Sequence, residues 1–208
     1  MIEFGCCVSS FDKLQSFVLP YVGDRPLHVV YNAPSIAWAY NSIIESVPFR
    51  MRELDALVLL HDDLEVTDPD ADSKFLAALN EDPDVALVGV CGGRNVRSLD
   101  WWSYDTVGHQ MIDTGLIDFG PRTGDVDSLE GSILVFSPWA IQFLRFDESY
   151  PGFHGYDEIS MLAKQEGLRN VVVDVDTHHH TIAGYKSEAS AREWEEADAR
   201  FRQKWIPW

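Results

Sequence analysis

The stretch Ala56-Leu-Val-Leu-Leu-His-Asp-Asp-Leu-Glu65 decides the fold predicted for this chain. Its run of consecutive apolar residues is typical of a fully buried strand and too short for a helix. Asp62 and Asp63 follow directly, at the carboxyl edge of the sheet, where open α/β sheets bind their ligands. Adjacent carboxylates repel each other unless a cation or a hydrogen-bond network compensates the charge. The stretch therefore predicts a divalent metal that holds a phosphate-bearing substrate, with an acidic turn after a core strand as the alternative.

Strands and helices are expected to alternate around this stretch. The predicted strands are residues 3–8, 27–31, 56–60 and 85–90. The predicted helices run from Ser9 or Ser10 to Leu19, closed by Pro20, and over 36–47, capped by Ser35, and 73–79. This order predicts a parallel, Rossmann-like half within an α/β fold. Its loops at Ser9, Asn32 and Asp62 should then meet at one edge of the sheet.

The second half of the chain has a different pattern. Residues 94–127 show no clear periodicity, which favours a functional lid or binding loop. Beyond them we expect a strand at 129–137, a short helix opened by Pro138, a helix from Asp157 to Gly167, a strand at 171–175 that leads into His178-His-His180, and an amphipathic helix at 187–204. Neither repeats nor an interdomain linker interrupt the sequence, so a single domain is predicted.

Charge and composition narrow the class of function. The formal net charge of -18 over 208 residues weighs against nucleic acid as a general partner. The sequence has neither a signal-peptide pattern nor an apolar run of about 20 residues, so no membrane span is expected. Cys6, Cys7 and Cys91 give no disulfide framework and are expected to be buried thiols. These features predict a cytoplasmic protein.

Seven motifs, in order, resemble a known family. They are Ser35-Ile-Ala-Trp-Ala-Tyr-Asn41, His61-Asp-Asp63, Val88-Gly-Val-Cys-Gly92, Leu129-Glu-Gly131, Phe146-Asp-Glu148, His154-Gly-Tyr-Asp157 and His179-His-Thr181. The chain resembles the family 2-like glycosyltransferases with a GT-A (nucleotide-diphospho-sugar transferase) fold, in particular short single-domain bacterial and phage members. The resemblance implies a mixed sheet flanked by helices, a nucleotide-binding half at 1–92 and an acceptor and catalytic half at 93–208.

The resemblance also implies roles for individual residues. Asp63 matches the metal-binding acid of the D-x-D signature, and Asp62 its middle position near the nucleotide, whereas His61 departs from the acid that many members have. A late histidine, His180 or else His178 or His179, would complete the metal site. Asp157 matches the general base of inverting members, and Glu130 an acid near the acceptor and donor sugar. Ser9, Asn32 and Asn41 would wrap the nucleotide, and His154 would contact the acceptor.

The implied reaction transfers a sugar from a nucleotide-sugar donor, expected to be a UDP-sugar, to an acceptor hydroxyl. Oxygen ligands suit Mg²⁺ or Mn²⁺, and an added imidazole favours Mn²⁺. Trp101 and Trp102 are either sugar-stacking platforms or core or interface residues. The acceptor could be a glycan, a small molecule or a protein, while the acidity disfavours DNA despite a basic strip at Arg94, Arg97 and Arg122. The rival readings are a nucleotidyltransferase, a sugar-phosphate hydrolase and a non-catalytic nucleotide- or carbohydrate-binding domain.

Overall fold

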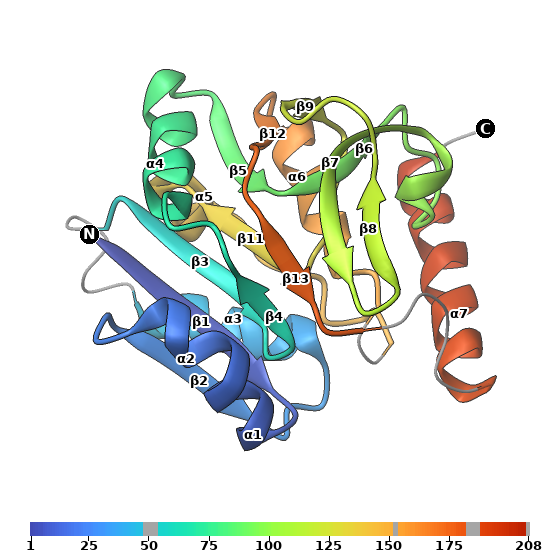
Figure 1. Cartoon of the computed structure of the whole chain (residues 1–208). Helices are drawn as coiled ribbons and strands as arrows, with labels where there is room; N and C mark the ends of the chain where they lie inside the picture. Colours follow the sequence, from blue (N-terminus) through green and yellow to red (C-terminus); the bar gives the residue numbers. More distant parts are fainter. Residues whose placement is uncertain (48–53, 152–153, 182–187, 207–208) are drawn as a thin grey trace.

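A computed structural model describes residues 1–47, 54–151, 154–181 and 188–206. Its main sheet has seven strands, flanked by helices (Figure 1). In spatial order these strands are β2 (Leu27–Tyr31), β1 (Ile2–Val8), β3 (Ala56–His61), β11 (Ile133–Phe136), β5 (Val85–Gly89), β12 (Arg169–Val172) and β9 (Gly124–Val126). Because β11 runs antiparallel to both of its neighbours, the sheet is mixed, which confirms the predicted fold class.

The second sheet is smaller and lies beside the first. In spatial order it contains β10 (Ser128–Leu129), β6 (Cys91–Arg94), β7 (Asp105–Ile112), β13 (Thr177–His179) and β4 (Leu64–Val66), with β8 (Gly115–Asp118) paired to β7. The β13 strand runs between β4 and β7, so residues more than 100 positions apart in the sequence become neighbours (Figure 1).

The first three strands run parallel, as predicted, and their carboxyl ends coincide. Val8 of β1 lies opposite Tyr31 of β2, and Cys7 lies opposite His61 of β3. The loops that begin at Ser9, Asn32 and Asp62 therefore leave the sheet at the same edge. This convergence follows from the strand register alone.

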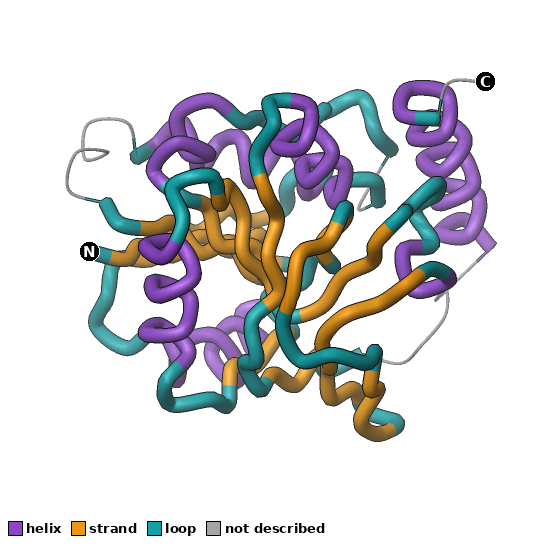
Figure 2. The backbone as a smooth tube through the Cα atoms, turned by 90° about the horizontal axis from the view of Figure 1, so that it is seen from above, coloured by secondary structure: helices purple, strands orange, loops and turns teal. Residues whose placement is uncertain are grey.

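Helices cover both faces of the main sheet, and a view from above places the strands between them (Figure 2). Alternate residues of β3 point to opposite faces, so Val58 and Leu60 join one apolar core and Leu57 and Leu59 the other. The first core includes residues of the π-helical segment Leu14–Val18, which follows α1 (Phe11–Lys13), and of α2 (Leu19–Val22), α4 (Ala71–Glu81) and α7 (Glu188–Trp205). The second includes residues of α3 (Ile36–Ser46), α5 (Pro138–Phe143) and α6 (Ile159–Gln165).

Local signals explain most helix boundaries. The Ser35 side chain accepts a hydrogen bond from the backbone N–H of Trp38 and starts α3, as predicted. Ser137 caps α5 in the same way, with Pro138 in its first turn. Pro20, in contrast, does not end the first helix. A π-helical segment, Leu14–Val18, links α1 to α2, and the helix ends at Gly23, whose φ is +59°.

The prediction for residues 94–127 was wrong. This segment contains a short 3-10 helix, Trp101–Ser103, and the strands β7, β8 and β9. Its strand pattern is weak because buried positions of β7 hold His109 and Gln110 rather than apolar residues. The predicted strand at 129–137 is also interrupted, since residues 130–132 separate β10 from β11.

Both sheets combine strands from either side of residue 92, so the two functional halves stay a prediction. The C-terminal helix α7 begins at Glu188, within the predicted range, while Ser187 lies outside the described residues. None of the helices in the described part of the chain is long and apolar enough to cross a membrane.

Candidate metal and catalytic site

Asp62 organises the loop that follows β1. Its Oδ2 atom accepts hydrogen bonds from the backbone N–H of Ser9 at 2.6 Å, the Ser9 hydroxyl at 2.7 Å and the backbone N–H of Ser10 at 2.9 Å. The carboxylate is 5% exposed, so these three donors replace its lost hydration. Asp62 therefore fixes the shape of the loop predicted to wrap a nucleotide.

Asp63 lies in a cluster with two imidazoles. His179 Nε2 is 3.2 Å from Asp63 Oδ1, and ligand atoms of His61, Asp63 and His179 all lie within 4.8 Å of one another. The Nε2 atom of His61 is buried and has no hydrogen-bond partner among the described residues. An orphaned imidazole nitrogen beside a carboxylate and a second imidazole fits a divalent transition-metal ion.

Charge in the cluster keeps its groups ready to bind a cation. Burial favours protonation of Asp63, but the His179 bond, nearby His61 and Lys13 outweigh it and hold the Asp63 pKa well below its usual range. Burial, together with His179, lowers the pKa of His61, which favours the neutral, metal-binding imidazole. Lys13 Nζ lies 2.9 Å from Asp63 Oδ2 and 3.8 Å from Asp62 Oδ1, so its ammonium partly balances the two carboxylates.

The structure does not bring the side chain of His180 to Asp63. Its Nε2 lies 3.0 Å from Glu65 Oε2, and its ring stacks on Phe17, with 3.8 Å between ring centroids. Neighbouring residues on a strand point to opposite faces, so His179 is the histidine of the three that faces Asp63. The sequence left this choice open because it depends on the pairing of β13 with β4.

Asp157 belongs to a 3-10 turn, Tyr156–Glu158, ahead of α6. Burial raises the pKa of Asp157 to about 7, and the nearby Glu130 and Glu158 add to the rise. Tyr156, the first residue of this turn, contacts the cluster, with its ring centroid 5.5 Å from that of His61. A Cβ atom at Gly131 would lie 1.7 Å from the Tyr156 ring, so only glycine allows this approach.

Glu130 lies in the break between β10 and β11. Its carboxylate accepts hydrogen bonds from the backbone N–H of Ser132, at 2.9 Å, and from the Ser132 hydroxyl. The Ser132 Oγ atom in turn accepts a bond from Gln110 Nε2 at 2.9 Å. The structure thus brings Glu130 into the electrostatic neighbourhood of His61 and Asp157, in a fixed orientation.

The two asparagines predicted to contact the nucleotide occupy different settings. Asn32 is exposed in the loop after β2, in a left-handed conformation with φ of 53°, at the same edge as Ser9. Asn41 is 7% exposed within α3, and its amide exchanges hydrogen bonds with the main chain of Phe146, at 2.9 and 3.0 Å. It also donates to Glu148 at 2.8 Å. Asn41 therefore ties α3 to the Phe146–Glu148 segment, which satisfies its amide internally.

The three residues predicted to bind the acceptor occupy different environments. Trp101 is 5% exposed and packs against Phe119, so its ring belongs to the core. Trp102 is 49% exposed and available for stacking. His154 is half-buried, with Nε2 3.3 Å from the Ser190 hydroxyl of α7.

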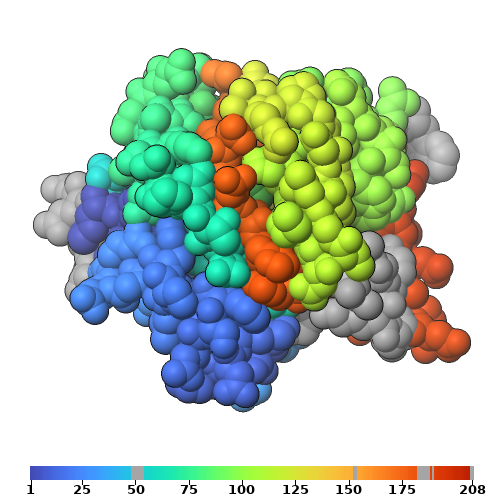
Figure 3. Space-filling view, viewed as in Figure 1, coloured from blue at the N-terminus to red at the C-terminus, as the bar shows by residue number. Residues whose placement is uncertain are grey.

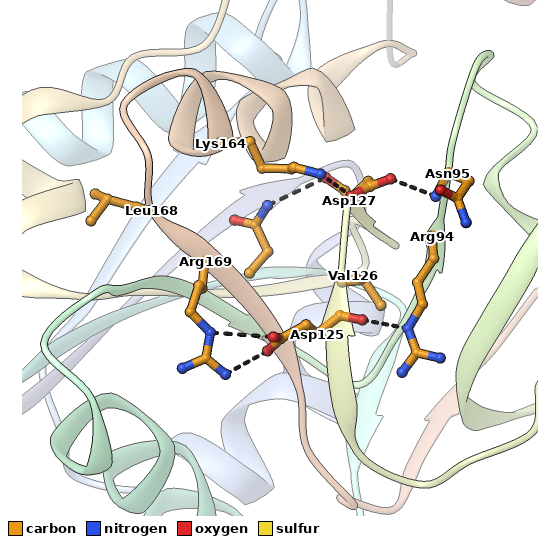
Figure 4. A pocket seen from close by; sticks show the side chains of 9 residues that line it. Arg94, Asn95, Asp125, Val126, Asp127, Lys164, Leu168 and Arg169 are labelled. Carbon is orange, nitrogen blue, oxygen red and sulfur yellow. Dashed lines mark hydrogen bonds and ion pairs between the residues drawn. The ribbon is translucent and has the colours of Figure 1, made fainter.

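A cavity of about 340 Å³ lies at the other end of the sheet (Figure 4). Arg169 in its wall lies opposite Val85, at the start of β5, whereas the Asp63 cluster lies beyond the carboxyl end of β3. Arg94, from the predicted basic strip, also lines this cavity, but it donates to the Asp125 carbonyl at 2.7 Å. Lys164 and Arg169 pair with Asp127 and Asp125, so acids offset the positive charge of the cavity.

Comparisons with known proteins agree with this arrangement. Residues 3–205 match the family described as "Glycosyltransferase like family". The streptomycin biosynthesis protein StrF of Streptomyces griseus is 27% identical over 217 residues, covering 99% of this chain and 75% of StrF. The crystal structure of A197 from STIV matches with a TM-score of 0.58 at 12% identity, covering 87% of this chain and 86% of A197.

A further solved structure is a glycosyltransferase involved in the glycosylation of the major capsid of PBCV-1. It is 12% identical, covers 94% of this chain and 98% of its own, and has a TM-score of 0.49.

The fold and the site define a class of protein: a GT-A-type α/β domain with acids and histidines gathered at the carboxyl edge of its sheet. The chain belongs to the glycosyltransferase-like family, since the match extends over almost its whole length.

The site contains residues that the sequence reasoning did not assign. His61 was noted only as a departure from the D-x-D pattern, yet its imidazole is part of the cluster. Lys13 and Tyr156 were also missed. Lys13 could have been found from its position in the sequence. It lies in the first helix after β1, beside the loop expected to meet Asp62.

Proposed function

We propose that the protein is a metal-dependent, inverting glycosyltransferase that moves a sugar from a nucleoside-diphosphate donor to an acceptor hydroxyl. One observation supports this most directly. The His61–Asp63–His179 cluster is linked through Tyr156, whose ring contacts His61, to the next residue, Asp157, whose pKa is raised to about 7. A cation site for a diphosphate and a base poised near neutral pH are the two elements such a transfer needs.

Asp157 acts as the general base in this proposal. The acceptor hydroxyl gives its proton to the Asp157 carboxylate while its oxygen forms a bond to the anomeric carbon. The bond between that carbon and the diphosphate oxygen breaks, and the nucleoside diphosphate departs with the bonding electrons. Attack opposite the leaving group inverts the configuration, and the transition state has oxocarbenium character. The raised pKa makes the carboxylate a better proton acceptor than an ordinary aspartate.

Asp63, His61 and His179 would hold the cation. A bound divalent ion, Mn²⁺ in preference to Mg²⁺ because of the imidazoles, would supply positive charge next to the leaving diphosphate. Glu130 is held by Ser132 close enough to Asp157 to raise its pKa, which suits a role beside the sugars. The Ser9 loop, ordered by Asp62, is the proposed nucleotide contact together with Asn32.

The identities of the donor and the acceptor are more specific proposals. We propose a UDP-sugar donor and a small-molecule, glycan or protein acceptor. The printed name of StrF places that protein in streptomycin biosynthesis, which favours a small-molecule acceptor as the first to test. Three free thiols, Cys6, Cys7 and Cys91, support a location in the reducing cytoplasm.

The test separates donor binding from transfer. Calorimetry with UDP-, GDP- and dTDP-sugars plus Mn²⁺ should give binding for one base, and mass spectrometry should show a glycosylated acceptor and free nucleoside diphosphate. The Asp157→Asn variant should keep donor binding and lose transfer by about 10²-fold or more. Unchanged transfer in this variant would refute Asp157 as base. Release of pyrophosphate, or cleavage of a phosphate ester instead, would refute the glycosyltransferase proposal.

A further inference from the structure

A second group of potential ligands lies on the opposite face of the β4–β13 pair. Glu65, His178 and His180 each offer a ligand atom, and these atoms lie within 4.8 Å of one another. His178 and His180 are two positions apart, so both side chains project away from His179. The main chain keeps this alignment beyond β13, because the His180 N–H donates to the Asp63 carbonyl at 2.8 Å.

Two carboxylates from different elements flank the paired imidazoles. Glu65 of β4 approaches His180, with 3.0 Å between Oε2 and Nε2. Asp113, in the turn between β7 and β8, places its Oδ1 3.4 Å from His178 Nε2 and 3.7 Å from His180 Nδ1. The turn is anchored to the same strand, because the Asp113 N–H donates to the Thr181 carbonyl at 3.1 Å.

One imidazole nitrogen of His178, Nε2, has an ion-pair contact with Asp113, at 3.4 Å, but no hydrogen bond within the described residues. This atom is shielded from solvent. The two imidazole rings stack with 3.8 Å between centroids, and Phe17 covers the other side of His180. Shielding a polar nitrogen from water without a hydrogen bond is costly, and a metal ion would satisfy it.

We propose that Glu65, His178 and His180, with Asp113 as a fourth ligand, form a second metal site that takes a zinc-type divalent ion. Two imidazoles and two carboxylates complete a tetrahedral ligand set for Zn²⁺. In such a site, neighbouring ligand atoms are roughly 3.3 Å apart for bonds of about 2.0 Å. Ligand atoms of Glu65, His178 and His180 lie within 4.8 Å of one another, and the Asp113 side chain would have to turn toward them to become the fourth ligand. The site is independent of the proposed catalytic cluster, which lies on the other face of the strands.

This second site would tie together three elements: β4, β13 and the β7–β8 turn. In the space-filling view, the segment of β13 lies at the surface between atoms of β4 and those of β7 and β8 (Figure 3). Because an ion bound only by the folded chain stabilises it by mass action, zinc should raise the thermal midpoint. The proposal concerns metal binding and does not depend on the transferase proposal.

The test measures zinc binding without reference to transfer. An Asp63→Asn, His179→Gln background disables the catalytic cluster, and calorimetry with ZnCl₂ on the tag-free chain should still give one equivalent. Adding His178→Gln should weaken zinc binding by at least about tenfold. Even the loss of a residue that only hydrogen-bonds to a metal ligand lowers metal affinity by about that factor. The zinc-dependent rise in thermal midpoint should disappear with it.

His28→Gln is the matched control. The His28 side chain is 29% exposed, like that of His178, lies on a strand, and bonds to a carboxylate, that of Glu3, at 2.7 Å. The other ring nitrogen of His28 contacts the Ser46 hydroxyl at 3.2 Å rather than a second carboxylate. This control should leave zinc binding intact. Absence of binding in the background variant, or unchanged affinity after His178→Gln, would overturn the proposal. Should the background variant not fold, His178→Gln in the otherwise natural chain should lower the zinc stoichiometry by one, and an unchanged stoichiometry would overturn it.

Discussion

At the level of single residues, the half-buried Asp157 has two expected effects, one on the proposed reaction and one on the folded state. Its pKa is raised to about 7, chiefly by burial. The carboxylate is the form that accepts a proton, and it is also the form that the buried environment disfavours. The two consequences lead to separate experiments.

The first experiment is a pH profile of transfer. We expect kcat/KM to rise with pH through an inflection at or below about 7 and then to level off, because only ionised Asp157 accepts the acceptor proton. A cation in the Asp63 cluster adds positive charge and moves the inflection downward. Asp157→Glu should retain the rising profile. A profile that stays flat from about pH 5 to about pH 9 would contradict the assignment.

The second experiment measures stability. Below pH 3 the carboxyl group is protonated in both the folded and the unfolded state and contributes no difference. Above about 7 it is ionised in both, and the folded state bears the cost of burying the charge. Asp157→Asn should therefore raise the free energy of unfolding at pH 8, by at most about 4 kcal/mol, with the gain disappearing in acid. Urea denaturation at the two pH values measures it, and a loss of stability at pH 8 would count against the raised pKa.

A third residue-scale prediction concerns Asp62. Replacing it with alanine leaves two backbone donors and the Ser9 hydroxyl without their acceptor, so we expect a loss of about 2–4 kcal/mol and weaker donor binding. The exposed Asp12, in the helix after the same loop, is the control. Its change to alanine should cost no more than about 0.5 kcal/mol. Calorimetry measures donor binding and urea denaturation measures stability. Equal effects of the two variants would show that Asp62 does not order the loop.

At the level of elements, Asn41 joins α3 to the segment that follows α5. Asn41→Ala removes two bonds to the main chain of Phe146, so it should destabilise the protein by about 2–4 kcal/mol. Because the Asn41 amide bonds within the protein, we expect the folded fraction of the variant to bind nucleotide with nearly unchanged affinity. The neighbouring Ser42, whose hydroxyl bonds to the Trp38 carbonyl near the surface, provides the control. A large loss of affinity without loss of stability would restore the original nucleotide-binding interpretation.

Elements with strong local signals were predictable from the sequence. The strand at Leu27–Tyr31 and the start of α3 at Ser35 agree with the prediction, because apolar pattern and capping are local properties. The second sheet was missed because polar residues occupy buried positions of β7 and because β4 and β13 pair across more than 100 residues. The His109 ring, for example, is buried in β7 yet reads as polar in the sequence.

The candidate site shows the same division. The sequence located the edge at Asp62 and Asp63, since the end of a buried strand is visible in its residues. The sequence did not show which of the three histidines faces Asp63, because the direction of their side chains depends on the register of β13 against Leu64–Val66. The cooperation of His61 with His179 likewise depends on a contact between residues far apart in the sequence.

At the scale of the whole molecule, charge is the dominant feature. A net charge of -18 produces self-repulsion that salt screens. Raising NaCl from about 10 mM to about 150 mM shortens the Debye length from about 30 Å to about 8 Å. We therefore expect the thermal midpoint at pH 8 to rise over this range, measured by calorimetry with divalent ions removed. A falling midpoint would show that attractive ion pairs outweigh the repulsion.

The pairing of β4 with β13 also has a consequence for how the protein is made. Leu64–Val66 leaves the ribosome long before Thr177–His179, and both groups of imidazole ligands require the later strand. A nascent chain can form its first parallel strands early, but neither cluster is complete until His179 and His180 have been synthesised and this long loop has closed. If the two proposed sites bind metal, loading is therefore expected to follow the assembly of β4 with β13.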